Sequence, residues 1–127
     1  MNKIAKVFVV LAAFVLVVGL GAQEAVDFSS DAADVVEITV ENDGLTFVTE
    51  SITVRQGQTV LLTFVNTGGF HDWVLDEFDA ATAQIRRGQS ETIEFVADQA
   101  GTFEFYCSVG NHRRAGMFGE FVVVAAD

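Results

Sequence analysis

Short apolar runs separated by turn-forming residues dominate the chain from Val35 onward. Within several runs, apolar and polar residues alternate with a period of two, which is typical of strands with one buried face. Phe103, Phe105 and Cys107 share one face of their run, whereas Thr102 lies on the other. The pattern predicts strands at 36–41, 45–48, 51–55, 59–66, 72–75, 82–85, 91–96, 102–107 and 119–124.

Turn sequences rich in Gly, Asn, Asp and Gln separate these runs. They lie at 41–44, 56–58, 66–69, 87–89 and 98–101. Regularly spaced short strands without an amphipathic helix predict an all-β sandwich. The only helical element we expect is a single turn within 76–83.

The first 22 residues have a different composition. Lys3 and Lys6 precede an uninterrupted apolar run over 7–21, which ends in small residues. This order predicts a secretory signal peptide over 1–22. A retained N-terminal anchor is the alternative, although the run is shorter than the ~20 apolar residues of a membrane span.

Residues 23–34, QEAVDFSSDAAD, are small, polar and acidic. We expect them to form a flexible acidic linker before a single domain over 35–127.

The chain is strongly acidic, with a formal net charge of −11 at pH 7. Its only lysines lie in the predicted signal peptide, so cleavage would make it more acidic still. Such a charge argues against nucleic-acid binding, which needs a basic surface, and favours solubility and partners with basic faces. We expect an exported monomer in the periplasm or at the extracytoplasmic face of a membrane; the membrane tether depends on retention of the N-terminal segment.

The chemistry-bearing residues are few and fall close together. The chain has one cysteine, two histidines and one methionine beyond the start residue: His71, Cys107, His112 and Met117. Two imidazoles, a thiolate and a weak thioether are the ligand set of a mononuclear copper electron-transfer site. Zinc also binds Cys and His, but a structural zinc site needs a fourth strong ligand and Met is a poor one. Gly110 suits the tight turn that would bring His112 back toward Cys107.

Two segments, NTGGFHDWVLDEF at 66–78 and GTFEFYCSVGNHRRAGMFGEFVV at 101–123, resemble the cupredoxin family of small blue copper proteins. The resemblance covers roughly 35–124. It implies a Greek-key β-sandwich of about eight strands, one copper ion, and single-electron transfer between redox partner proteins, with no substrate. It also implies that His71, Cys107 and His112 are equatorial ligands and Met117 the axial one, with the carbonyl of Phe70 or a neighbour as a distant contact.

The chain departs from the family pattern at two places. Many relatives carry a proline before the second His, where this chain has Gly110 and Asn111 and no proline at all. The residue after the first His is often Asn, but here it is Asp72. We expect Asp72 to accept hydrogen bonds from Ser108 or from backbone N–H groups, and its charge to stabilise Cu(II) and lower the reduction potential.

The resemblance further implies that electrons leave through the exposed edge of His112. The expected apolar surround consists of Phe70, Val109, Gly110, Ala115 and Phe118. Arg113 and Arg114 flank this edge, and we expect them to orient partners; the alternative is that they offset nearby acids.

Other functions remain open at this point. A copper nitrite reductase or multicopper oxidase needs further histidines for a second copper centre, and this chain has two in all. A Cys–His nucleophile pair is conceivable, but no other feature suggests acyl transfer, so we expect no enzyme. An exported copper carrier, chaperone or redox sensor would use the same four ligands.

Overall fold

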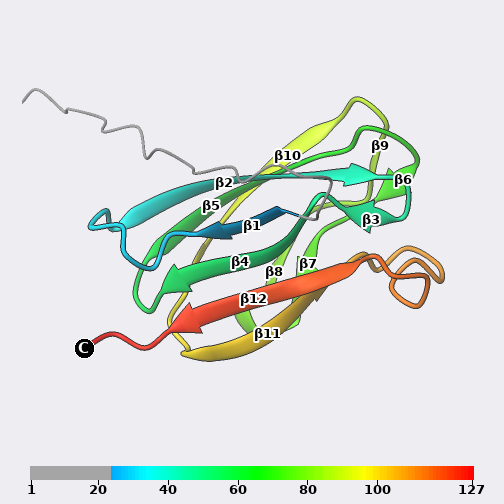
Figure 1. Cartoon of the computed structure of the whole chain (residues 1–127). Helices are drawn as coiled ribbons and strands as arrows, with labels where there is room; N and C mark the ends of the chain where they lie inside the picture. Colours follow the sequence, from blue (N-terminus) through cyan, green and yellow to red (C-terminus); the bar gives the residue numbers. More distant parts are fainter. Residues whose placement is uncertain (1–23) are drawn as a thin grey trace, which may run out of the picture.

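The computed structural model describes residues 24–127, and the predicted signal peptide therefore lies outside the described part (Figure 1). Strands account for nearly all the regular structure, which confirms the all-β prediction. They are β1 (Glu24–Asp27), β2 (Val35–Asp43), β3 (Thr46–Phe47), β4 (Thr49–Arg55), β5 (Thr59–Val65), β6 (Phe70–His71), β7 (Val74–Leu75), β8 (Ala80–Ala81), β9 (Ile85–Arg86), β10 (Ser90–Val96), β11 (Gly101–Tyr106) and β12 (Phe118–Val124). The expected helical turn is the 3-10 helix η1 (Asp76–Phe78).

Two larger sheets form the layers of the sandwich. One has six strands in the order β1-β4-β12-β11-β7-β8, and the other has four in the order β10-β5-β2-β3. The short strands β6 and β9 pair separately. β4 runs parallel to β12, and β2 runs parallel to β5, whereas β11 is antiparallel to β12. The direct β11–β12 pairing places the two ends of the connecting loop side by side.

The core lies between the two larger sheets. The predicted alternation holds in β5, where Leu62 and Phe64 are buried, and along β11, where Phe105 and the following Cys107 are buried. Trp73 stacks against Phe105 with their ring centroids 5.2 Å apart. Burial of these apolar side chains supplies the main driving force for folding, and it places Cys107 at the edge of a packed aromatic core.

The expected linker at 23–34 is corrected by the structure. Glu24–Asp27 forms β1, which pairs in parallel with β4, and Phe28 is buried in the core. The buried Gln58 amide donates to the carbonyl oxygens of Phe28 and Ala33, at 3.3 Å and 3.0 Å. The acidic composition gave no sign of this strand. The segment is ordered by its backbone pairing with β4 and by one buried aromatic side chain.

The strand count is also higher than the expected eight or so, since the described residues contain twelve. Much of the excess comes from two-residue pairings such as β6 with β9 and β7 with β8. Strands this short have no detectable period in the sequence. In the described part of the chain, no helix has the length and apolar character needed to cross a membrane.

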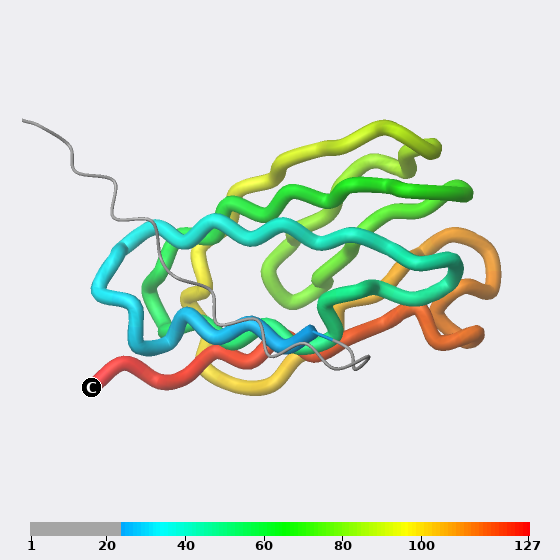
Figure 2. Tube along the Cα trace, turned by 45° about the horizontal axis from the view of Figure 1, so that its top comes forward, coloured from blue at the N-terminus to red at the C-terminus, as the bar shows by residue number. Residues whose placement is uncertain are grey.

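One end of the sandwich gathers the connections that matter for function. The segment between β11 and β12 lies at the same end as the β2–β3 turn and β6, while the C-terminus lies at the opposite end (Figures 1 and 2). Residues far apart in the sequence therefore meet at one end of the sheets.

Candidate metal centre

Two segments of the chain carry the four predicted ligand residues. His71 ends β6, Cys107 follows β11, His112 lies in the connecting turns, and Met117 directly precedes β12. Cys107 and Met117 are fully buried, His71 is 2% exposed, and His112 is half-buried. We call residues 107–117 the ligand loop and residues 66–71 the His71 turn.

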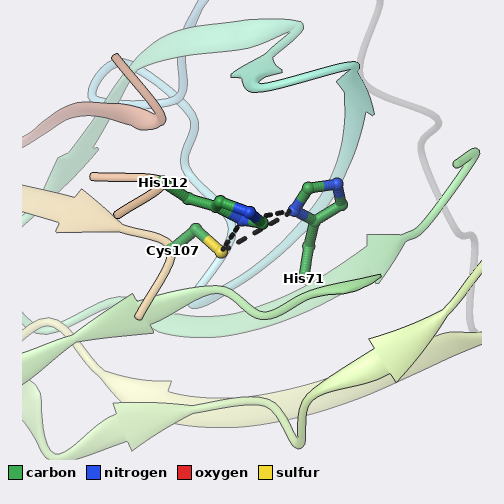
Figure 3. Close-up of side chains that lie close together, drawn as sticks. All are labelled: His71, Cys107 and His112. Atoms are coloured by element: carbon green, nitrogen blue, oxygen red, sulfur yellow. Dashed lines mark hydrogen bonds between the residues drawn. The ribbon is translucent and has the colours of Figure 1, made fainter. Parts of the chain in front are cut away.

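The three strongest donors converge (Figure 3). The Nδ1 atoms of His71 and His112 lie 3.1 Å apart, and the Cys107 Sγ lies 3.8 Å from the former and 3.5 Å from the latter. The point equidistant from these three atoms lies about 2.0 Å from each, close to the ~2.0–2.3 Å that nitrogen and sulfur ligands keep from a zinc ion. The spacing and the softness of the donors both fit a single copper ion.

Backbone hydrogen bonds fold the ligand loop back on itself without a proline. The Cys107 N–H donates to the Met117 carbonyl at 3.0 Å, and the Met117 N–H donates to the His112 carbonyl at 3.0 Å. The His112 N–H donates to the Val109 carbonyl at 3.0 Å. Gly110 has a φ of 47°, in the left-handed region where glycine is favoured. The backbones of three predicted ligands are thus linked directly to one another.

Asp72 joins the His71 side of the site to the ligand loop. One carboxylate oxygen accepts the Ser108 N–H at 2.7 Å, and the other accepts the Ser108 hydroxyl. Both bonds were expected from the sequence. They lie next to two predicted ligands, because Asp72 follows His71 and Ser108 follows Cys107.

The His71 turn is held by two buried asparagines that sequence reasoning missed. The Asn42 amide donates to the Gly68 carbonyl at 3.0 Å, and its oxygen accepts the Thr67 N–H at 2.9 Å. Asn66 accepts the Gly68 N–H and donates to the Ile85 carbonyl, at 2.9 Å and 2.8 Å. Their signal in the sequence is weak, since both look like ordinary turn residues.

The turn also packs closely on the ligand ring. A methyl group at Gly69, whose φ is 83°, would lie 2.6 Å from Nε2 of His71. The Gly68 backbone also acts on the ring, where it raises the pKa of His71. Such contacts at the second ring nitrogen orient a histidine ligand.

The surroundings set the protonation of the donors. Burial lowers the pKa of His71, and the neighbouring His112 lowers it further, while Gly68 and Asp72 act in the opposite direction. The neutral imidazole is thereby favoured, with a lone pair for a metal. Burial raises the pKa of the Cys107 thiol, against the N–H groups of Asp72 and Val109, which lower it. Metal binding must therefore displace the thiol proton.

Comparison with known proteins agrees with this geometry. The model of the cupredoxin-like domain matches residues 8–123. The chain belongs to the cupredoxin family. It is 34% identical over 114 residues to the chloroplastic plastocyanin of Pisum sativum, a match covering 80% of this chain and 66% of that protein. It is also 31% identical over 104 residues to the copper-resistant cuproprotein CopI of Rubrivivax gelatinosus, covering 66% of this chain and 63% of that one.

Solved structures show the same fold. Auracyanin from Roseiflexus castenholzii matches with a TM-score of 0.63 and 28% identity, over 69% of this chain and 96% of its own. Reduced rusticyanin matches with a TM-score of 0.65 and 22% identity, over 79% and 84% of the two chains. The copper nitrite reductase of Nitrosomonas europaea has a TM-score of 0.60 at 23% identity, but only 42% of that chain is covered.

In this cupredoxin, Arg113 is engaged within the molecule. Its Nε donates to Glu104 at 2.7 Å, and its guanidinium carbon lies 3.8 Å from the centre of the Tyr106 ring. The Tyr106 hydroxyl in turn donates to the Asp76 carboxylate at 2.9 Å. Arg113, which directly follows His112, therefore attaches the ligand loop to β11.

The expected apolar surround of His112 is partly rearranged. A shallow depression beside the cupredoxin site is lined by Gly44, Leu45, Gly68, Gly69, Phe70, His71, Val109 and His112. Leu45, which the sequence did not suggest, contributes from the β2–β3 turn and is 43% exposed. Phe118 is 47% exposed but, like Gly110 and Ala115, is not among the residues that line the depression.

Proposed function

We propose that the protein is a type 1 copper protein that carries single electrons between redox partner proteins. The convergence of the His71, Cys107 and His112 donors on one point is the observation that supports this most strongly. Met117, buried and hydrogen-bonded through its backbone to two of these residues, is the proposed axial ligand.

Copper would supply the redox chemistry by cycling between Cu(I) and Cu(II). The thiolate and thioether suit the reduced state, and the imidazoles suit both states. The protein's part is to keep the donors in place through the cycle. The hydrogen bonds that Asp72 accepts from Ser108, and those that Asn42 and Asn66 make with the His71 turn and its surroundings, provide that rigidity, since they restrain the residues on both sides of the site.

The proposed electron path leaves through the half-buried ring of His112 into the depression beside it. Val109 and Phe70 line this surface and exclude water from a docked partner. We further propose that the protein acts outside the cytoplasm, since residues 1–22 read as a signal peptide. Its donor and acceptor would then be exported or membrane-bound redox proteins.

The test is reversible redox cycling of the copper-loaded protein. One equivalent of Cu(II) should bind, give an intensely coloured species, bleach with ascorbate and recover with an oxidant. Cys107→Ser should abolish the colour because it removes the thiolate, whereas Ser108→Ala should retain it. Copper that binds but cannot be cycled would exclude electron transfer.

A copper carrier is the second candidate, and the similarity to the copper-resistant cuproprotein CopI favours it. The two functions differ in how tightly copper stays bound. An electron-transfer protein should retain copper when challenged with a Cu(I) chelator, whereas a copper carrier should release copper to the chelator readily. An enzyme is disfavoured, because both histidines of the chain already lie in this site and a second copper centre would need more.

A further inference from the structure

The few basic residues of this acidic protein are unevenly placed. The described residues contain five arginines: Arg55, Arg86, Arg87, Arg113 and Arg114. The last four lie in β9, the turn after it and the ligand loop, at the end that carries the metal site (Figures 1 and 2). Arg55 pairs with Val124 at the far end of β12, about 20 Å from Phe118 at ~3.3 Å per residue.

Three of these four arginines have no carboxylate partner. Among residues 24–127, the only ion pair within 4.0 Å joins Arg113 to Glu104. Arg86, Arg87 and Arg114 are all exposed. On a chain with 18 acidic residues, three unpaired guanidinium groups at one end form a local positive surface. We call these three residues the arginine collar.

The collar borders the depression that contains the proposed electron exit. The Arg86 guanidinium carbon lies 5.7 Å from the centre of the Phe70 ring, which lines the depression and is 40% exposed. The turn that carries Arg87 is fixed to the His71 turn, because the Gly88 N–H donates to the Asn66 carbonyl at 2.8 Å. Arg114 lies two residues beyond His112. Two acidic residues are adjacent in sequence to the lining: Asp43, exposed at the end of β2 beside Gly44, and Asp72, buried beside His71.

We propose that this end docks a redox protein with an acidic face around its own electron-exchange site. The inference rests on the proposed function and specifies its partner. The collar attracts carboxylates, the apolar floor excludes water next to His112, and the acidic remainder of the protein repels the partner elsewhere. Because exposed charges are screened within ~10 Å at 0.1 M salt, the charges at this end, the collar among them, act on a partner at His112 more strongly than the net charge does.

The test measures electron transfer from the reduced protein to two small oxidants of opposite charge. Anionic hexacyanoferrate(III) and cationic tris(phenanthroline)cobalt(III) each accept one electron, leaving Cu(II). Despite the negative net charge, we expect the rate with the anion to fall about threefold to tenfold as salt rises from low to physiological levels. A triple variant, Arg86→Glu, Arg87→Glu and Arg114→Glu, should reverse this salt dependence.

Arg55→Glu is the matched control for each single reversal, since it changes the net charge equally at the opposite end. It should leave the salt dependence with the anion unchanged, whereas Arg86→Glu should weaken it. If the wild-type rate with the anion rises with salt, or if Arg55→Glu acts like Arg86→Glu, the proposal is overturned. Failure of the proposed function would look different, because neither oxidant would then take an electron.

A membrane surface is the competing occupant. Vesicles containing phosphatidylglycerol should not sediment the copper-loaded protein at physiological salt. If the wild type sediments with the vesicles and the triple variant does not, the collar binds anionic lipid, and the proposal of an acidic protein partner is overturned.

Discussion

The His71 turn and the ligand loop hold the same site by different means. The turn contributes one proposed ligand and is fixed from outside, by buried amide side chains of Asn42 and Asn66. The loop contributes three within eleven residues and is fixed mainly by its own backbone hydrogen bonds. Asp72 and Ser108 connect the two.

This difference indicates where each half is vulnerable. Packing and buried hydrogen bonds make the His71 turn intolerant of added volume, because close-packed groups cannot move aside. The loop has more freedom, since its tertiary restraints are a few contacts at its ends and surface. Substitutions in the turn should therefore affect metal binding more than substitutions on the loop surface.

The largest effect is expected from Gly69→Ala. Its methyl group would collide with the His71 ring at 2.6 Å, and displacing an oriented ligand should weaken copper binding about 10–100-fold. Gly88→Ala is the control, because Gly88 has the same φ of 83° but nothing within 4 Å of the added methyl. Competition with a copper chelator measures both. If both variants lose copper affinity equally, backbone strain is the cause and not the collision with the His71 ring.

The connection between the two halves is tested by Asp72→Asn. Removing a negative charge beside the copper should destabilise Cu(II) and raise the reduction potential by on the order of 50–100 mV. Asp43→Asn makes the same change in charge at an exposed turn residue and should shift the potential much less. Potentiometric titration decides between them, and an unchanged or lower potential in Asp72→Asn would contradict the proposed electrostatic role.

A smaller effect is expected from Arg113→Gln. The substitution removes an exposed ion pair and a stacking contact, together worth ~0.5–1.5 kcal/mol, from the loop surface. Copper release to a chelator should become about twofold to tenfold faster. The same rate in Arg114→Gln, which lacks these contacts, would show that loss of charge alone is responsible.

The smallest effect concerns the metal-free protein at alkaline pH. Burial raises the pKa of Cys107 above its ordinary value near 9.0. The folded state therefore favours the protonated thiol, and its contribution to stability is complete below pH ~9 and lost as the pH rises through the higher folded pKa. In denaturant unfolding, the free energy of unfolding should fall above pH 9 in the wild type, and it should fall less in Cys107→Ala. Identical pH profiles for the two proteins would contradict the raised pKa of Cys107.

Much of this molecule is predictable from its sequence. Alternation along β5 and β11 predicts the strands and the inward face of Cys107, because a period of two is imposed by strand geometry. The four proposed ligands stand out through their scarcity. The Asp72–Ser108 link follows from the position of each beside a ligand.

The remainder depends on contacts between distant parts of the chain. β1 is stabilised by Phe28 and Gln58, which are 30 residues apart. The role of Asn42 depends on a turn 26 residues away. Arg86 lies near the proposed metal site only because β9 pairs with the short strand β6. The sequence gives no reason to distinguish Arg113 from Arg114, because the contacts of Arg113 with Glu104 and Tyr106 depend on the fold.

The most direct test of the account is the absorption and EPR spectrum of the protein loaded with one equivalent of Cu(II). We expect an intense blue or green species with a narrow copper hyperfine splitting, because the Cys107 thiolate would share the copper with two imidazoles. A weakly coloured product with ordinary copper EPR would show that Cys107 is not a ligand and would contradict the central claim.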